Sequence, residues 1–175
     1  RDQPRSRGLG DVYKRQAFVI SRQTGFSPED GQAFINRYFG EYPGIREYVN
    51  SIKGTVKRQG YVETLIGRRR YIPEIRSRNF HVRSAAERMA INMPIQGSAA
   101  EMIKLAMAAI HKEFIKKKME SKMILQIHDE LLFEFPDSEE ETLIDLVTTE
   151  MEKALPLSIP VVVDYGIGDN WYEAH

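Results

Sequence analysis

The sequence is most constrained by the stretch KMILQIHDELLFEF, in which three polar residues separate two apolar runs. The runs Met123–Ile127 and Leu131–Phe135 are rich in Ile, Leu and Phe, a composition typical of buried strands. His128, Asp129 and Glu130 lie between them, and their polarity predicts a tight turn. The stretch therefore predicts a β-hairpin that holds two adjacent carboxylates and an imidazole at its tip.

Adjacent carboxylates at the end of a rigid hairpin repel each other unless a cation lies with them. Hard oxygen ligands of this kind favour Mg²⁺ or Mn²⁺. Asp129 and Glu130 are therefore candidate ligands of a divalent cation. A polar turn with solvated charges is the alternative, and the spacing of the residues alone does not separate the two interpretations.

The composition sets the class of protein. A chain of 175 residues holds one ordinary domain or two small subdomains that share a core. The sequence has no cysteine, which excludes disulfides and thiolate metal sites and fits the cytoplasmic location that we expect. It also has no apolar run of the ~20 residues needed to span a bilayer and no signal-peptide pattern, so no membrane association is predicted.

The formal net charge of +0 conceals a strong asymmetry along the chain. Between Lys57 and Arg88 there are nine basic residues and three acidic ones. From Asp129 onward there are thirteen acidic residues, and Lys153 is the only basic one. This segregation predicts a polyanion-binding site beside a cation-dependent site, although two solvated faces would give the same pattern.

The N-terminal half predicts helices followed by a small basic hairpin. Ser27 can cap a helix whose first position is Pro28, and a second helix is expected to end at Gly60. The segments Tyr61–Leu65 and Arg69–Ile72 are predicted to pair as strands. The consecutive arginines 68, 69 and 70 in this hairpin either grip phosphates or form a solvated edge that resists strand pairing.

Three further elements are expected downstream. A helix over Ser84–Met93 is predicted to break at Pro94 and to restart at the capping box Ser98–Glu101. A second capping box, Ser138–Glu141, opens another helix. The segment Val161–Ile167 is expected to be a strand that joins the hairpin in one antiparallel sheet.

Several segments resemble, in the same order, the family A DNA polymerases of the bacterial DNA polymerase I type. QIHDEL between two apolar strands is similar to motif C of that family, and several matching segments together are a far more specific signal than HDE alone. The other matching segments are YFGEYPGIREY, QGYVETLIGRRRYIPEI, AAERMAINMPIQGSAAEMIK and the terminal GDNWYEAH.

The resemblance implies an α+β fold, with an antiparallel palm-type sheet and packed helices preceded by a partial helical fingers subdomain. Residues 17–80 would be the C-terminal part of the fingers, and residues 81–175 the C-terminal part of the palm that carries motif C. Residues 1–16 do not match the family pattern. We interpret them as a non-family tail, such as a cloning or assembly scar.

The resemblance also implies the chemistry: template-directed nucleotidyl transfer to a primer 3′-hydroxyl by a two-metal-ion mechanism, in DNA replication and repair. Two Mg²⁺ ions are expected in the complete enzyme, with Mn²⁺ as a substitute. Asp129 matches the metal ligand of motif C, and Glu130 matches its neighbouring acid, which has a more supportive catalytic role. His128 matches the residue that lies against the primer terminus.

The same resemblance assigns DNA contacts to the region around Pro94. The positions that match Arg88, Asn92 and Gln96 contact the primer–template in the family, and Arg83 continues the basic run and is added to the DNA-binding set. Without the resemblance, Asn92 and Gln96 would be interpreted as local caps. The implied partners are primer–template DNA and, in the complete enzyme, a dNTP, and the protein is expected to be a monomer.

Motif A, with the second metal-binding aspartate, and the motif B helix are not found in this sequence. The chain is therefore expected to be a fragment of a polymerase domain that is inactive alone. Two other functions stay open. One is a metal-dependent phosphohydrolase or nuclease that uses Asp129 and Glu130 with Asp164 and Asp169, and the other is a non-catalytic nucleic-acid-binding module that uses the arginine run.

Overall fold

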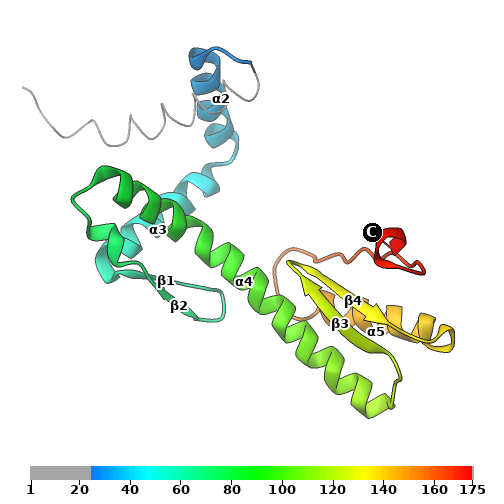
Figure 1. The fold of residues 1–175 in the computed structure, drawn as a ribbon. Coiled ribbons are helices and arrows are strands. Elements are labelled where there is room, and N and C mark those ends of the chain that lie inside the picture. The colour runs from blue at the N-terminus through cyan, green and yellow to red at the C-terminus, as the bar shows by residue number, and fades with distance from the viewer. Residues whose placement is uncertain (1–24, 175) are drawn as a thin grey trace, which may run out of the picture. The chain divides into compact units, whose positions relative to one another are not determined.

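The computed structural model of the chain describes residues 25–174, which divide into two compact units between Gln59 and Gly60 (Figure 1). The predicted non-family tail, residues 1–16, lies outside the described residues. The assignment of residues 17–80 and 81–175 to fingers and palm stays a prediction. Each unit is described by itself below.

The first unit contains two helices, α2 (Pro28–Glu41) and α3 (Pro43–Gln59). The Ser27 side chain accepts the Asp30 backbone N–H at 3.1 Å, and Pro28 is the first helical residue, so the predicted cap is confirmed. Gly60 follows the last residue of α3 with φ of 80°, a left-handed conformation that glycine adopts without steric cost. The predicted end of the second helix is therefore also confirmed.

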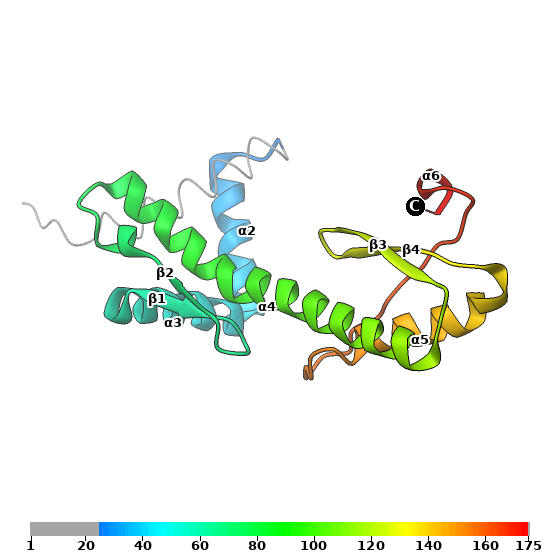
Figure 2. The same cartoon turned by 60° about the horizontal axis from the view of Figure 1, so that its bottom comes forward.

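The second unit is organised around the long helix α4 (Phe80–Lys117) (Figures 1 and 2). The elements before it are β1 (Tyr61–Glu63), β2 (Arg69–Tyr71) and the 3₁₀ turn η1 (Pro73–Arg76). The elements after it are β3 (Lys122–Ile127), β4 (Glu130–Glu134), η2 (Asp137–Glu139), α5 (Glu140–Glu152) and α6 (Trp171–Ala174). The first hairpin pairs β1 with β2 in antiparallel fashion, as predicted.

Helix α4 runs without interruption through Pro94, so the predicted break at this residue is wrong. A proline inside a helix removes one backbone hydrogen bond and costs about 3 kcal/mol relative to Ala. The helix continues because other elements pack against it on both sides of Pro94. The predicted restart at a capping box is also wrong, because Ser98 and Glu101 bind the β1–β2 hairpin and cap no helix.

The two halves of α4 bury different faces. Apart from Ser98, the buried residues of the N-terminal half lie on one face: Ala86, Ala90, Met93 and Glu101. Those of the C-terminal half lie on another: Ile103, Ala106, Ile110 and Phe114. At about 100° per residue, the two faces are separated by about 130° around the helix axis. The first face meets β1 and η1, and the second meets α5 and the β3–β4 hairpin.

The β3–β4 hairpin has a two-residue loop. Ile127 pairs with Glu130, which leaves His128 and Asp129 as the loop, and His128 has φ of 53°. Two-residue hairpin loops of this kind require positive φ, because the twist of the turn must match that of the strands. The predicted hairpin is confirmed, but the three-residue tip is not, since the register makes Glu130 the first residue of β4.

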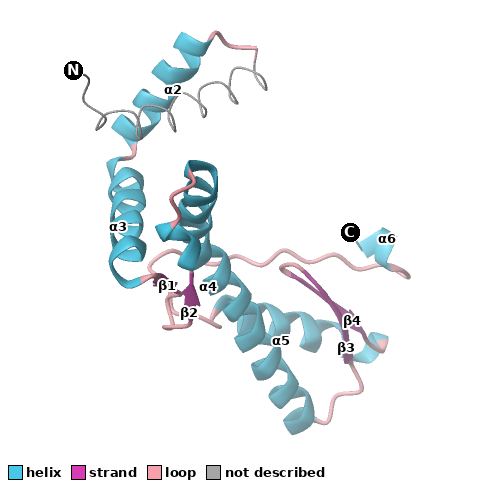
Figure 3. Cartoon of the chain, turned by 60° about the vertical axis from the view of Figure 1, so that its left-hand side comes forward, coloured by secondary structure: helices cyan, strands magenta, loops and turns pink. Residues whose placement is uncertain are grey.

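The β3–β4 hairpin lies beside α5 and the C-terminal half of α4 (Figure 3). Side chains on one of its faces form a hydrophobic core with these two helices. The rings of Phe114 on α4 and Phe133 on β4 meet edge to face, with centroids 6.1 Å apart. The core residues of the helices are Ala106, Ile110, Phe114, Leu143 and Leu146, and the hairpin adds Met123, Leu131, Phe133 and Phe135. Aliphatic and aromatic packing therefore sets the position of the acidic loop relative to α4.

Two predictions about the C-terminal part are wrong. Ser138 does not cap α5, which begins at Glu140 after the short turn η2 without a side-chain cap bond. The segment Val161–Ile167 is not a strand. A strand needs a partner for its backbone groups, and the two strands of the neighbouring hairpin pair only with each other. The backbone N–H of Val163 instead donates to the Glu152 carboxylate at 3.3 Å.

The described residues are thus mostly helical, with two small antiparallel two-stranded sheets in place of one larger sheet. Within this part of the chain, no helix is both long enough and apolar enough to cross a membrane.

Candidate nucleic-acid and metal-binding site

The loop of the second hairpin presents its polar side chains to solvent. His128, Asp129 and Glu130 are all exposed. The Gln126 side-chain amide donates to the His128 carbonyl at 3.0 Å and closes the loop from the β3 side. The loop and the first residue of β4 therefore offer two carboxylates and an imidazole on a backbone that a short turn and a packed hairpin hold in place.

Asp129 and Glu130 line a concavity of about 1110 Å³. Helix α4 contributes Ala99 and Met102 to its lining, and residues 161–171 near the C-terminus contribute another part. The two acidic residues of the loop thus share one hollow with the middle of α4.

The predicted DNA-binding residues of α4 lead along the helix into this hollow. Arg88, Asn92 and Gln96 are exposed and four residues apart, a spacing that puts them on one face of an uninterrupted helix. Ala99 follows Gln96 by three residues on the same face and lines the hollow. The stripe then continues through Ile103, Ala106, Ile110 and Phe114, the face that packs toward the β3–β4 hairpin and α5. This alignment exists only because α4 continues through Pro94.

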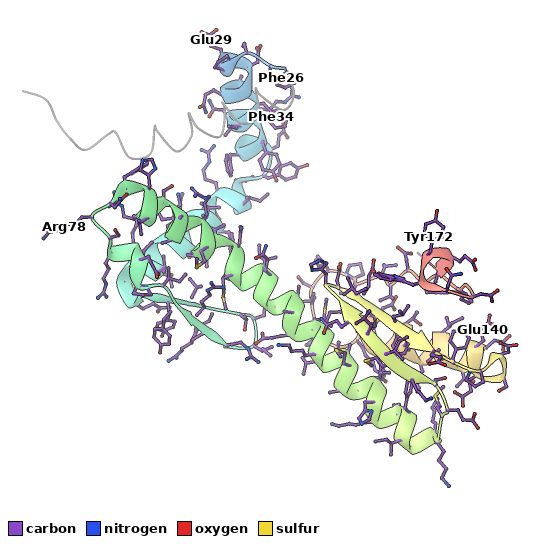
Figure 4. The ribbon with its side chains drawn as sticks, in the orientation of Figure 1. Phe26, Glu29, Phe34, Arg78, Glu140 and Tyr172 are labelled. Atoms are coloured by element: carbon purple, nitrogen blue, oxygen red, sulfur yellow. The ribbon has the colours of Figure 1, made fainter. Side chains whose placement is uncertain are left out.

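Arg83 and Arg88, both predicted to bind DNA, have different local contacts. The Arg83 guanidinium donates to the Ser77 carbonyl at 2.8 Å and lies over the Phe80 ring, 5.9 Å from its centroid. Arg88 donates to the Ser84 hydroxyl one turn earlier at 3.1 Å. Figure 4 shows Arg78, on the loop that leads into α4, directed outward. Arg83 therefore supports this loop, whereas Arg88 lies in the exposed stripe.

The described residues contain no group of three or more His, Asp or Glu side chains that is able to hold a metal ion. Asp164 and Asp169 line the same concavity as Asp129 and Glu130 but do not complete such a group. The nuclease interpretation, which needs these carboxylates together, gains no support. The two carboxylates of the loop fit Mg²⁺ by donor type but not by number.

Glu101 was predicted from the sequence as part of a capping box and not as part of a site. Glu101 is 4% exposed, and its Oε1 accepts from Arg68 Nε at 2.6 Å. The Thr64 hydroxyl and the Arg68 guanidinium lower the pKa of the Glu101 carboxyl, while burial opposes them. The available signal was the spacing from Ala90 and Met93 to Gly97 and Glu101, which marks one face when α4 is taken as continuous.

Comparison with known proteins identifies the family. The family described as DNA polymerase family A matches residues 1–173, and the chain belongs to this family. The matched range includes residues 1–16, whose assignment as a non-family tail stays a prediction.

The chain is 44% identical to DNA polymerase I of Bacillus caldotenax and 44% identical to that of Bacillus subtilis; each match covers 99% of this chain and 20% of the relative. It therefore spans about a fifth of the length of these proteins. Among solved structures, it is similar to the POL domain of Pol1 from M. smegmatis in complex with DNA primer-template and dNTP. That match has a TM-score of 0.88 and 40% identity, and it covers 95% of this chain and 29% of the other.

Proposed function

We propose that this chain is the motif C portion of a DNA-directed DNA polymerase, with a palm-type unit around the β3–β4 hairpin and part of the fingers before it. One observation carries the proposal. The exposed stripe of Arg88, Asn92 and Gln96 leads along α4 to the hollow that holds Asp129 and Glu130. Groups that suit a nucleic-acid strand and groups that suit a divalent cation thus lie along one path.

The stripe on α4 suits a primer–template duplex. Arg88 offers a charged, multidentate donor for phosphate, and the amides of Asn92 and Gln96 offer both donors and acceptors for sugars and base edges. His128 at the hairpin loop would lie against the primer terminus. The similar M. smegmatis structure contains primer-template DNA and a dNTP, which supports these partners for the complete enzyme.

Family A polymerases use Mg²⁺, and Asp129 is the residue of this chain that we assign as a ligand, with Glu130 in support. When bound in such a site, the metal supplies activation of the primer hydroxyl and stabilisation of charge at the transferred phosphate. The described residues supply two adjacent carboxylates and no group of three acidic or histidine ligands. A complete site therefore requires a further ligand from the rest of the polymerase.

A binding titration tests the proposed duplex site directly. The full 175-residue chain is titrated into fluorescein-labelled primer–template DNA at several salt concentrations, with anisotropy as the signal. Each neutralised phosphate contributes about 0.9 to the slope of log affinity against log salt. We expect Arg88→Ala to reduce this slope by about 0.9.

The matched control is Lys112→Ala, an exposed basic residue on another face of the same helix. Its slope is expected to equal that of the unmodified chain. Equal slopes for Arg88→Ala and Lys112→Ala would remove the stripe from the DNA site.

A further inference from the structure

The β1–β2 hairpin lies so close to α4 at position 97 that only glycine fits there without displacing it. A methyl group at Gly97 would lie 2.7 Å from Thr64 Cγ2, well inside van der Waals contact. Thr64 is buried and lies at the end of β1, where the turn of the hairpin begins. The hairpin turn is therefore seated on one defined turn of the helix.

Hydrogen bonds add direction to this contact. The Ser98 hydroxyl accepts the Leu65 backbone N–H at 2.9 Å and donates to the Pro94 carbonyl at 2.6 Å. The Arg68 backbone N–H donates to the Thr64 hydroxyl at 3.0 Å, which closes the turn. Ser98 thus joins the hairpin turn to the helical turn that contains Pro94.

An ion pair completes the attachment. Arg68 Nε donates to the buried Glu101 carboxylate at 2.6 Å, while the arginine side chain itself is 65% exposed. The other oxygen of Glu101, Oε2, is buried without a hydrogen-bond partner in the described residues. Loss of Arg68 would leave this buried carboxylate with the Thr64 hydroxyl and the charge of Lys104 as favourable interactions, and its burial would then be less well compensated. The Nε group of Arg68 is therefore committed to an internal ion pair.

The second arginine of the run is also held. Arg69 Nε donates to Glu63 at 2.7 Å across the hairpin, and its guanidinium lies 4.7 Å from the centroid of the Tyr61 ring. The hydrogen bond to Glu63 is the largest of the contacts that raise the pKa of Arg69. On the face of the hairpin that carries Tyr61 and Glu63, the Arg69 guanidinium is thus engaged in contacts within the hairpin.

The third arginine differs from the other two. Arg70 pairs with Val62 in the hairpin register, so its side chain leaves the opposite face of the sheet from Arg69. Its side chain is exposed, and within the described residues this guanidinium has no hydrogen bond or ion pair. Its full set of guanidinium donors is available to a ligand.

We propose that the arginine run is divided: Arg70 binds a phosphate of duplex DNA, Gly97 and Ser98 are positioning residues that seat the hairpin for this contact, and the Arg68–Glu101 pair contributes to stability alone. The inference rests on the proposed DNA-binding function. It replaces the expectation that the three arginines act alike. Arg68 and Arg69 are structural, and the seat on α4 fixes where Arg70 meets the DNA backbone.

The salt dependence of DNA binding separates these roles. With the same anisotropy titration of the full chain, Arg70→Ala should reduce the log–log slope by about 0.9. The double variant Arg68→Ala/Glu101→Gln removes the ion pair without leaving a buried charge, and the contacts of Gly97 and Ser98 remain. Its slope should equal that of the unmodified chain. A normal slope for Arg70→Ala, or a reduced slope for the double variant, would contradict the claim that Arg70 binds phosphate and Arg68 does not.

Gly97→Ala tests the seat itself. The added methyl should displace the hairpin and reduce the slope by about 0.9, as Arg70→Ala does. Adding Thr64→Ser removes the methyl that clashes, keeps the hydroxyl, and should restore the slope. In the Arg70→Ala background, Gly97→Ala should lower the slope no further. Failure of Thr64→Ser to rescue, or a further fall in the Arg70→Ala background, would contradict positioning.

Thermal melting tests the Arg68–Glu101 attachment without DNA, so its result is independent of the proposed function. Arg68→Ala should lower Tm, and adding Glu101→Gln should recover most of the loss, whether or not DNA binds. Absence of salt-dependent binding by the unmodified chain would overturn the proposed function and the role of Arg70. If Tm does not recover in the double variant, the Arg68–Glu101 pair does not attach the hairpin to α4.

Discussion

The two hairpins that pack on α4 are held by different forces. The β1–β2 hairpin buries the apolar side chain of Val62 and adds a glycine contact, a bridging hydroxyl and an ion pair to buried Glu101. The β3–β4 hairpin is attached by a core of aliphatic and aromatic side chains around Phe114 and Phe133. Polar attachment is directional and sensitive to single atoms, whereas apolar packing depends mainly on volume and buried area.

This difference matches the charges that the hairpins carry. The first presents a basic edge, which in our proposal meets a phosphate of DNA, and directional bonds hold such an edge in one position. The second presents two adjacent carboxylates that repel each other, and a hydrophobic core holds them without using polar groups. One uninterrupted helix supports both, which aligns the basic and amide stripe of Arg88, Asn92 and Gln96 with the acidic loop.

The largest expected effect is chemical and falls on the loop of the second hairpin. To measure it, residues 17–175 replace the matching segment of Bacillus subtilis DNA polymerase I in a chimera. Asp129→Asn removes the charge that holds the cation, which should lower single-turnover incorporation by on the order of a thousandfold or more. Tm should hardly change, since Asp129 is exposed and its loss relieves repulsion from Glu130.

Glu130→Gln should lower incorporation less, because the family resemblance gives that residue a supporting role. His128→Ala should weaken placement of the primer terminus and leave metal binding in place. The 175-residue chain alone should give no primer extension above background. Near-normal incorporation by the Asp129→Asn chimera, or loss that tracks unfolding, would make the hairpin loop purely structural.

The next largest effect is on stability and falls on the apolar attachment. Phe114 is 7% exposed and contacts Phe133, so Phe114→Ala should destabilise the chain by about 3–5 kcal/mol through lost burial and a cavity. The neighbouring Ile115 is 66% exposed, and Ile115→Ala should change stability by less than about 0.5 kcal/mol. Urea unfolding measures both. Similar values for the two variants would show that this core does not hold the second hairpin.

The smallest expected effect is a pH dependence at the start of the second hairpin. The Glu139 carboxylate accepts the backbone N–H groups of Glu120 and Ser121, each at 2.9 Å. The Ser121 hydroxyl and these N–H groups lower its pKa below the ordinary value of 4.5, while burial opposes them. Its contribution is therefore full above pH 4.5 and is lost as the pH falls through the lowered folded-state pKa.

Glu139→Gln should reduce stability at pH 7 and should make the unfolding free energy depend less on pH in the acid range. Glu141→Gln, an exposed neighbour on α5, serves as the control. An acid profile of Glu139→Gln that parallels that of the unmodified chain would show that this carboxylate does not tie the hairpin.

Local patterns in the sequence predicted both hairpins and the Ser27 cap, because turns, strand alternation and caps depend on residues close together in the chain. They did not predict the continuity of α4. Pro94 is a strong local signal for a helix end, and tertiary packing on both sides overrides it. Ser98 and Glu101 have the spacing of a capping box. This local pattern gave no indication that the two side chains instead contact the β1–β2 hairpin.

The irregular segment 161–167 shows the converse limit. Its composition favours a strand, but a strand forms only where another backbone offers hydrogen bonds. The family resemblance predicted the individual residues of the site but not their arrangement in space. Their alignment along α4 required the continuous helix.

The central claim is that α4 directs its exposed stripe to the acidic loop, and a cleavage footprint tests it most directly. The sequence has no cysteine, so Gln96→Cys, Asp129→Cys or Lys112→Cys each creates one attachment point for an iron–EDTA cleavage reagent. With end-labelled primer–template bound to the full chain, we expect labels at positions 96 and 129 to cut near the primer 3′ end. The label at position 112 should leave the DNA intact. Cuts from position 96 far from those of position 129, or equal cutting from position 112, would contradict the claim.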